Sequence, residues 1–153
     1  MKTIAVSGGF DPIHCGHVKM ILSAFIHGRV VVILNSDTWL LRKKGYIFQP
    51  WADRACILKN LWPVDTVVPV NDDNGTVGDA LRDLRPDFFG KGGDRTAHNV
   101  PEIPLCEELG IGVIFGLGGD KVTSSQALVE SASRRLSQME VDRTHIRQAW
   151  EGV

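Results

Sequence analysis

The stretch SGGFDPIHCGHVKM, residues 7–20, links an apolar run to an amphipathic segment. The run at residues 4–6 predicts a buried strand. Beyond the stretch, apolar side chains recur at the i, i+3, i+4, i+7 spacing of a helix with one buried face: Val18, Ile21, Leu22 and Phe25. Two glycines therefore follow a strand, and His14 and His17 stand where a helix begins.

The rest of the chain continues the alternation of strand and helix. Apolar runs at 30–34, 64–70, 88–89 and 112–115 predict four more strands, and the segments 51–62 and 77–84 carry helical stripes. This order favours an α/β fold with a doubly wound, parallel, Rossmann-like sheet, because right-handed crossovers place helices on both faces of such a sheet.

The length of 153 residues suits a single domain, which we place at residues 1–137. The remaining residues, 138–153, are polar apart from Met139, Ile146 and Trp150, which have loose helical spacing. This C-terminal tail is either an appended helix or an oligomer contact, and the sequence leaves both open.

Charge and cysteine content narrow the functional classes. The formal net charge is -1, so we expect neither a nucleic-acid partner nor a basic face for an anionic membrane. The three cysteines show no zinc spacing and fit reduced thiols. No apolar run reaches the length of a membrane span, and the N-terminus lacks a signal-peptide core, so we expect a cytoplasmic protein.

Ligands of doubly wound sheets bind beyond the carboxyl ends of the strands. Four clusters of glycines and polar residues follow predicted strands, at residues 8–17, 35–44, 91–94 and 116–125. We therefore expect these four clusters to form one binding site.

The histidine pair suits an anion. Residues three apart at a helix start face the same way, and the free backbone N–H groups there already favour negative charge. Two imidazole donors at that end would hold the oxygens of a phosphoryl group. One alternative is a pair of partly buried histidines whose hydrogen bonds are purely structural. Another is a transition-metal site with Asp11 or Cys15, but it needs a further ligand converging on the same point, so we predict no metal ligands.

The motif GGFDPIHCGH resembles the GxFDxxHxGH signature of the cytidylyltransferase-like nucleotidyltransferases. Later blocks resemble, in order, those of the adenylyltransferase domain of ADP-heptose synthesis enzymes, and more loosely those of glycerol-3-phosphate cytidylyltransferase. The blocks are LNSDTWLLRKKG, DRACIL, VDTVV, RPDFFGKGGD and VTSSQAL. The resemblance covers residues 1 to about 130 and implies the HxGH nucleotidyltransferase fold.

The resemblance implies that an acceptor phosphate attacks the α-phosphorus of a nucleoside triphosphate and that pyrophosphate leaves. It assigns catalysis to His14, His17 and Lys44, and acceptor binding to Lys43. The implied nucleotide-binding residues, with Asp94 at the ribose, are Gly8, Gly9, Phe10, Asp11, Gly16, Arg54, Lys91, Gly92, Gly93, Asp94, Thr123, Ser124 and Ser125. A solvated patch remains the plain alternative for the lysines, and a helix cap for one of the hydroxyls.

One departure bears on the substrate. Glycerol-3-phosphate cytidylyltransferases have an arginine a few residues before the Ser/Thr block, where this chain has Gly118. Lys121 supplies a charge nearby but not the planar fork of a guanidinium. The departure favours ATP and a heptose-type sugar phosphate over CTP and glycerol phosphate.

Two further alternatives stay open. One is an FMN, pantetheine-phosphate or nicotinamide-mononucleotide adenylyltransferase, against which the KGGD block argues. The other is a catalytically inactive nucleotide-binding module, which we would expect to have lost a histidine or the lysines.

The implied partners are a nucleoside triphosphate, expected to be ATP and accompanied by Mg²⁺, and a small phosphorylated sugar or polyol. The sequence does not identify the acceptor, although the loops at 71–74 and 95–104 are candidates to line its side of the site. Dimers are common in the resembled family, so the resemblance allows a homodimer.

Overall fold

Five parallel strands form one sheet in the computed structural model, which describes residues 1–151. The strands are β1 (Thr3–Gly8), β2 (Arg29–Leu34), β3 (Val64–Pro69), β4 (Phe88–Gly92) and β5 (Gly112–Leu117). They match the five strands predicted from apolar runs, with small shifts at their ends. The prediction of a Rossmann-like α/β fold with a doubly wound parallel sheet is confirmed.

The strand order is β3-β2-β1-β4-β5. The chain winds outward from β1 to β3 and then crosses back, so that β4 pairs with β1 through Ile4–Val6 and Phe88–Gly90. The carboxyl ends of β1 and β4 therefore flank the point where the winding direction reverses. In open α/β sheets this crevice is where ligands bind.

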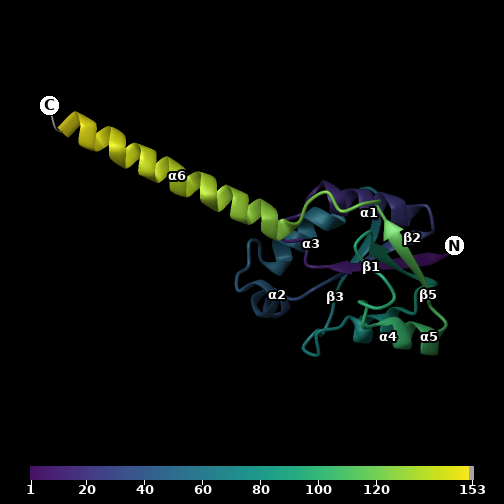
Figure 1. Ribbon diagram of the computed structural model, residues 1–153. Helices are drawn as coiled ribbons and strands as arrows, with labels where there is room; N and C mark the ends of the chain where they lie inside the picture. The colour runs from purple at the N-terminus through teal and green to yellow at the C-terminus, as the bar shows by residue number, and fades with distance from the viewer. Residues whose placement is uncertain (152–153) are drawn as a thin grey trace.

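Helices cover both faces of the sheet (Figure 1). Ile4 and Val6 of β1 pack on one face with α1 (Cys15–Phe25) and α3 (Trp51–Lys59). Ala5 points to the opposite face, where α4 (Gly78–Leu84) and α5 (Ile103–Leu109) complete a second core. This alternation follows from the two-residue period of a strand, and it places α1 and α4 on opposite sides of the β1–β4 crevice.

Three predicted core positions are wrong. The buried face of α1 is formed by Met20, Ile21 and Ala24, whereas Leu22 is 39% exposed and Phe25 44%. Trp62 was predicted on the α3 stripe, but that helix ends at Lys59, and Trp62 lies beyond it with 74% exposure. The two exposed rings contact each other edge-on, with 4.9 Å between their centroids.

The sequence did not predict α2 (Asp37–Lys44), which occupies most of the cluster at 35–44. Ser36 caps this helix, because its Oγ accepts a hydrogen bond of 3.0 Å from the backbone N–H of Trp39. The carboxylate of Asp72, after β3, accepts from Asn35 Nδ2 and from Ser36 Oγ. The end of β3 thus fixes the start of α2.

The last helix, α6 (Ser125–Glu151), is 27 residues long. It runs without a break across residue 137, so residues 138–151 of the tail are helical, while 152–153 lie outside the described residues. The domain boundary itself stays a prediction. Figure 1 shows α6 projecting away from the sheet and its covering helices. Within residues 1–151, no helix combines the length and apolarity that crossing a membrane requires.

Candidate active site

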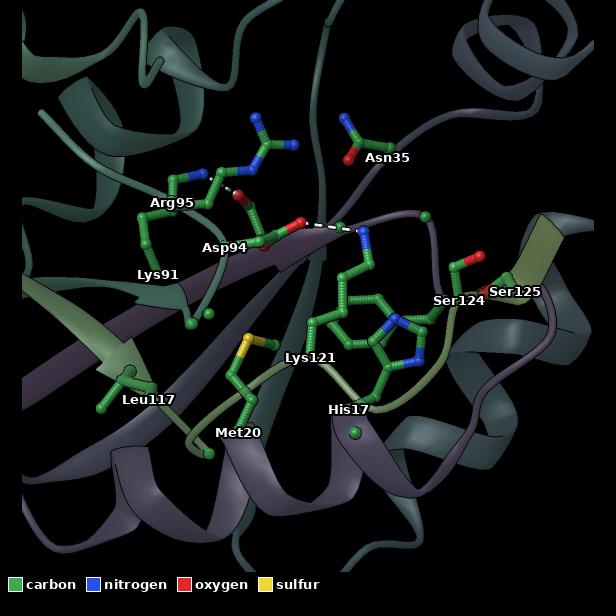
Figure 2. Close-up of a pocket in the computed structure, with 18 of the residues that line it drawn as sticks. His17, Met20, Asn35, Lys91, Asp94, Arg95, Leu117, Lys121, Ser124 and Ser125 are labelled. Carbon is green, nitrogen blue, oxygen red and sulfur yellow. Dashed lines mark hydrogen bonds and ion pairs between the residues drawn. The ribbon is translucent and has the colours of Figure 1, made fainter. Parts of the chain in front are cut away.

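A cavity of about 520 Å³ opens at the carboxyl edge of the sheet and is lined by residues from all four predicted clusters (Figure 2). Its volume is typical of small-molecule sites. Every predicted site residue lines it except Asp11 and Arg54. The four clusters are thus brought together as expected.

The two histidines begin α1 through a reciprocal pair of hydrogen bonds. His14 Nδ1 accepts from the backbone N–H of Gly16 at 3.1 Å, and His17 Nδ1 accepts from the backbone N–H of His14 at 3.2 Å. The rings stack with 3.7 Å between centroids. Because each Nδ1 is an acceptor, the neutral ring carries its proton on Nε2, which is the donor offered to a ligand.

Both imidazoles are held neutral. Burial, with smaller contributions from the charges of His14 and Lys44, lowers the pKa of His17 to about 3. Burial also lowers the pKa of His14, followed by the charges of Lys121 and Lys44. In the free protein at pH 7 the pair therefore acts through N–H donors and not through fixed positive charge.

The lysines at the end of α2 face the same cavity. Lys44 Nζ donates to the backbone carbonyl of Asp11 at 3.2 Å, and Lys43 Nζ lies 4.4 Å from the centroid of the Trp39 ring. Burial is the main cause that lowers the pKa of each lysine. Partial burial beside a cavity distinguishes Lys44 from a freely solvated residue, whereas Lys43 is exposed.

Asp11 is not brought to the cavity, which corrects its assignment to direct nucleotide binding. Its side chain is fully buried and accepts from the backbone N–H groups of Phe48 and Gln49, at 2.7 and 2.6 Å. The carboxylate thereby fixes the loop after α2 against the HxGH turn.

Arg54 requires the same correction, since its guanidinium is buried and four of its five N–H donors are already used. It donates to the carbonyls of Gly9 (2.8 Å), Asn35 (3.0 Å) and Gln49 (3.0 Å), and it pairs with Asp37 at 2.6 Å. Arg54 therefore connects the ends of β1 and β2 and does not line the cavity.

The segment after β4 packs closely against the segment after β5. A Cβ at Gly93 would overlap the carbonyl oxygen of Gly119. The space that a side chain at Gly93 would need is thus occupied by the protein's own backbone. Asp94 and Lys121 join the same two segments through an ion pair of 2.9 Å, which Figure 2 shows spanning the pocket.

Gly118 explains the missing arginine of the Ser/Thr block. Its φ is +80°, and a Cβ there would lie 2.7 Å from the backbone nitrogen of Met20. A side chain at this position would require the segment to move away from α1. Lys121, three residues later, is the cation that this segment presents to the cavity.

The hydroxyls at the start of α6 have divided roles. Ser124 Oγ accepts from the backbone N–H of Ala127 at 3.1 Å and so caps the helix. Ser125 Oγ donates to the carbonyl of Pro12 at 2.7 Å, which ties α6 to the HxGH turn. Thr123 lines the cavity beside them.

Lys91 and Glu102 face the cavity from the side of α4 and α5. Lys91 Nζ donates to Ser7 Oγ at 3.1 Å and lies 4.3 Å from the centroid of the Phe89 ring. Burial lowers its pKa to about 8, while the nearby charge of Glu102 acts in the opposite direction.

Glu102 is the functional candidate that the sequence did not single out. Its side chain is buried, and Oε1 accepts from the backbone N–H of Val77 at 3.1 Å. Within the described chain, its buried Oε2 has no hydrogen-bond partner. Only its place in the 95–104 loop was noted from the sequence, because a single glutamate in a loop carries no motif.

The described residues, 1–151, contain no cluster of three or more His, Cys, Asp or Glu side chains placed to hold a metal ion.

Comparisons with known proteins connect this site to a family. Residues 5–110 match the family model described as cytidylyltransferase-like. The bifunctional protein HldE of Streptomyces coelicolor is 39% identical over 110 residues, which are 70% of this chain and 23% of that protein. HldE of Sodalis glossinidius is 32% identical over 143 residues, or 92% of this chain and 29% of that protein. The chain thus spans less than a third of the length of these relatives.

Solved structures show the same fold at low sequence identity. A lipopolysaccharide core biosynthesis protein from Thermoplasma volcanium has a TM-score of 0.61 and 22% identity, covering 76% of this chain and 94% of that one. A protein of unknown function from Archaeoglobus fulgidus has a TM-score of 0.60 and 22% identity, covering 81% and 95% of the two chains.

Proposed function

The chain belongs to the cytidylyltransferase-like family of nucleotidyltransferases, and from this premise we propose that it transfers a nucleoside monophosphate to a phosphorylated sugar or polyol. The donor is a nucleoside triphosphate, with ATP preferred. An oxygen of the acceptor phosphate forms the new bond to the α-phosphorus, the bond from that phosphorus to the bridging oxygen of the β-phosphate breaks, and pyrophosphate leaves. The reaction most resembles heptose 1-phosphate adenylyltransfer.

The histidine pair at the β1–β4 crevice is the single observation that carries this proposal. Two neutral rings, each with its proton on Nε2, stand at the positive end of α1 in a cavity of suitable size. Phosphoryl transfer asks mainly for positioning and for stabilisation of developing charge. Donors fixed by their own Nδ1 hydrogen bonds meet that need without reorganising during the reaction.

Lysine side chains complete the proposed phosphate site. Lys44 and Lys43 approach from α2, and Lys121 approaches from the segment before α6. We assign these three lysines to the triphosphate and to the acceptor phosphate. Both phosphates are negatively charged, so their mutual repulsion must be overcome when they come together.

The side of the cavity formed by α4 and α5 is assigned to the acceptor. Lys91 supplies a cation there, and the unpartnered Oε2 of Glu102 supplies an acceptor for a hydroxyl group. A buried carboxylate oxygen without a partner is costly, and a sugar or polyol hydroxyl would satisfy it. This supports a polyhydroxylated acceptor.

Mg²⁺ is expected to accompany the triphosphate, where it would neutralise charge on the phosphate oxygens. The protein supplies no cage of three ligating side chains among residues 1–151. The donor set thus fits an ion held mainly by triphosphate oxygens and water, as is usual for Mg²⁺ at nucleotides. The carboxylates that line the cavity are those of Asp94, Glu102 and Asp120.

The choice of ATP rests on the segment before α6. The backbone at Gly118 leaves no room for the arginine that glycerol-3-phosphate cytidylyltransferases have near this position. Lys121, which pairs with Asp94, is a point charge and has no planar fork of the kind that a guanidinium offers.

The test is pyrophosphate release from each of the four nucleoside triphosphates, paired with heptose 1-phosphate, other sugar phosphates, glycerol 3-phosphate and FMN. We expect release with ATP and a sugar 1-phosphate. Activity only with CTP and glycerol phosphate would replace the proposed substrates by those of a cytidylyltransferase. Nucleotide binding without release from any pair would identify an inactive binding module.

A further inference from the structure

One face of α6 has an apolar heptad pattern that a single charged residue interrupts. Its positions alternate in spacings of three and four residues, and we call them the α6 stripe: Val129, Ala132, Leu136, Met139, Arg143, Ile146 and Trp150. The pattern assigns Val129, Leu136, Arg143 and Trp150 to heptad position a, and the others to position d. A 3.5-residue apolar repeat over three heptads indicates a coiled coil.

The described part of the protein leaves most of this stripe uncovered. Leu136 is 62% exposed, Met139 49%, Ile146 59% and Trp150 80%. Figure 1 shows that α6 leaves the rest of the molecule soon after its start, so the sheet and the other helices do not cover it. A long polar helix with one exposed apolar stripe gains most when that stripe packs against another helix.

The charges beside the stripe fit a second copy of the same helix. Arg135 and Asp142 occupy heptad position g, and Glu140 and Arg147 occupy position e. In a parallel pair, each g residue faces the e residue five positions later on the other helix. Arg135 would then face Glu140 of the partner subunit, and Asp142 would face Arg147 of the partner subunit, so both contacts join opposite charges.

Arg143 is the one charged residue within the stripe. A single polar residue at an a position lowers the stability of a coiled coil but fixes its register and the number of helices. In a parallel, in-register pair the two Arg143 side chains share one layer, where their long stems can turn the charged groups outward to water.

We propose that α6 forms a parallel, in-register, two-stranded coiled coil with α6 of a second copy of this chain. This interface is separate from the cavity and does not depend on the proposed reaction. It assigns the tail beyond residue 137 to self-association, and the beginning of the helix at Ser124 and Ser125 connects it to the site.

The oligomeric state of the full chain in analytical ultracentrifugation tests the proposal. We expect a dimer at micromolar concentration, and we expect Leu136→Glu and Ile146→Glu each to raise its dissociation constant by about tenfold or more. Val141→Glu is the matched control, because Val141 is 47% exposed but lies at position f on the opposite face of α6. A monomeric wild-type chain, a trimer or tetramer, or a dimer that both stripe variants leave intact would overturn the proposal.

Two further experiments predict stronger association, which unfolding of a variant could not produce. Arg143→Leu should tighten the dimer by removing the charged layer. Arg135→Glu should weaken it, and the double change Arg135→Glu with Glu140→Arg should restore it. An Arg143→Leu variant that associates no better than the wild type would contradict the assigned stripe.

The direction of the helices has its own test. A Trp150→Cys variant treated with oxidised glutathione should form a disulfide-linked dimer, because only a parallel pair brings the two ends of α6 together. The wild-type chain, which has the same three native cysteines, is the control. A dimer in solution that forms no additional cross-link at position 150 would overturn the parallel arrangement.

Discussion

His14 and His17 each use their two ring nitrogens for different purposes. Nδ1 accepts a backbone N–H and belongs to the helix start, while Nε2 holds the proton of a ring that lines the cavity. The structural interpretation of the HxGH spacing is therefore correct at Nδ1, and the functional interpretation stays a prediction for Nε2. The same hydrogen bonds that begin α1 also orient the donors.

Asparagine at position 17 separates these two roles. Its Oδ1 can accept the backbone N–H of His14 in place of Nδ1, but it has no group at the position of Nε2. We expect His17→Asn to lower turnover by about two orders of magnitude while leaving the melting temperature close to that of the wild type. His17→Ala loses the acceptor as well, so it should also lower the free energy of unfolding by about 1 kcal/mol.

The measurements are steady-state pyrophosphate release and thermal denaturation followed by circular dichroism. If His17→Asn retains near-normal turnover, Nε2 has no part in the reaction. If its melting temperature falls as far as that of His17→Ala, the hydrogen bond at Nδ1 does not stabilise the helix start.

At this scale the sequence predicted residues that lie in local motifs and missed those whose role depends on tertiary contacts. The HxGH spacing and the KGGD and VTSS blocks are continuous, so their members could be assigned to one cavity. Asp11 is held by hydrogen bonds to residues 37 and 38 positions away in the sequence. Arg54 is held by hydrogen bonds to residues 45 and 19 positions away. No local pattern distinguishes such a buried anchor from a ligand.

Among the elements, the contact between the segments after β4 and β5 shapes the nucleotide side of the cavity. Gly93 and Gly119 meet backbone to backbone, and the ion pair of Asp94 with Lys121 lies beside them. The position of Lys121 therefore depends on a glycine in a different segment.

We expect Gly93→Ala to raise the KM for the nucleoside triphosphate several-fold, because the new Cβ would push the 116–121 segment out of place. The sheet should persist, with an unchanged far-ultraviolet circular dichroism spectrum. Gly92→Ala is the comparison, since a Cβ there would make an ordinary contact of 3.7 Å with Met20 Sδ. Equal effects of the two variants on KM would show that the packing of Gly93 is not what positions the segment.

Hydrophobic periodicity in the sequence fails to predict the short helices α2 and α5. In α2 only Leu40 is buried, and in α5 only Cys106 is buried, so neither helix has a stripe that a pattern search can find. By contrast, the stripe predicted for α4 is Val77, Ala80, Leu81 and Leu84, of which the first three are buried and Leu84 is partly buried. Helices that cover a sheet with several side chains are predictable, and helices that touch it with one are not.

For the whole molecule, the buried neutral His17 predicts a dependence of stability on pH. In the unfolded chain this side chain takes up a proton near pH 6.5, the ordinary pKa of histidine, while in the folded protein it stays neutral down to about pH 3. The unfolded state thus binds more protons between these values, and stability falls as the pH falls through this window. His14, whose pKa is also lowered, acts in the same direction.

Urea denaturation at several pH values between about 5 and 7.5 measures this effect with little contribution from carboxylates. The free energy of unfolding should decrease toward the acid side. The decrease should be smaller in His17→Asn, which has no titrating group at this position. Identical slopes for the two proteins would contradict a depressed pKa at His17.

The arrangement of the sheet could be predicted only in part. Alternating runs indicated five parallel strands, because each strand is a short local pattern. The placement of β4 beside β1 depends on pairing between residues about 84 positions apart, for which the sequence alone offers no measure. The shared cavity follows from that placement, since it brings Lys91 to within 3.1 Å of Ser7.

The ion pair between Lys121 and Asp94 makes ligand entry, under the proposed function, an exchange of counter-ions. In the free protein the carboxylate is neutralised by the lysine, so an incoming triphosphate meets no isolated negative charge there. On binding, the proposed function would have Lys121 turn to a phosphate and Asp94 become free for the ribose hydroxyls. Both side chains are about half exposed, and pairs of this kind contribute at most about 1 kcal/mol, so the exchange costs little. The same ion pair would form again when the product departs. Lys121 would thus bind Asp94 in the empty site and a phosphate in the filled site.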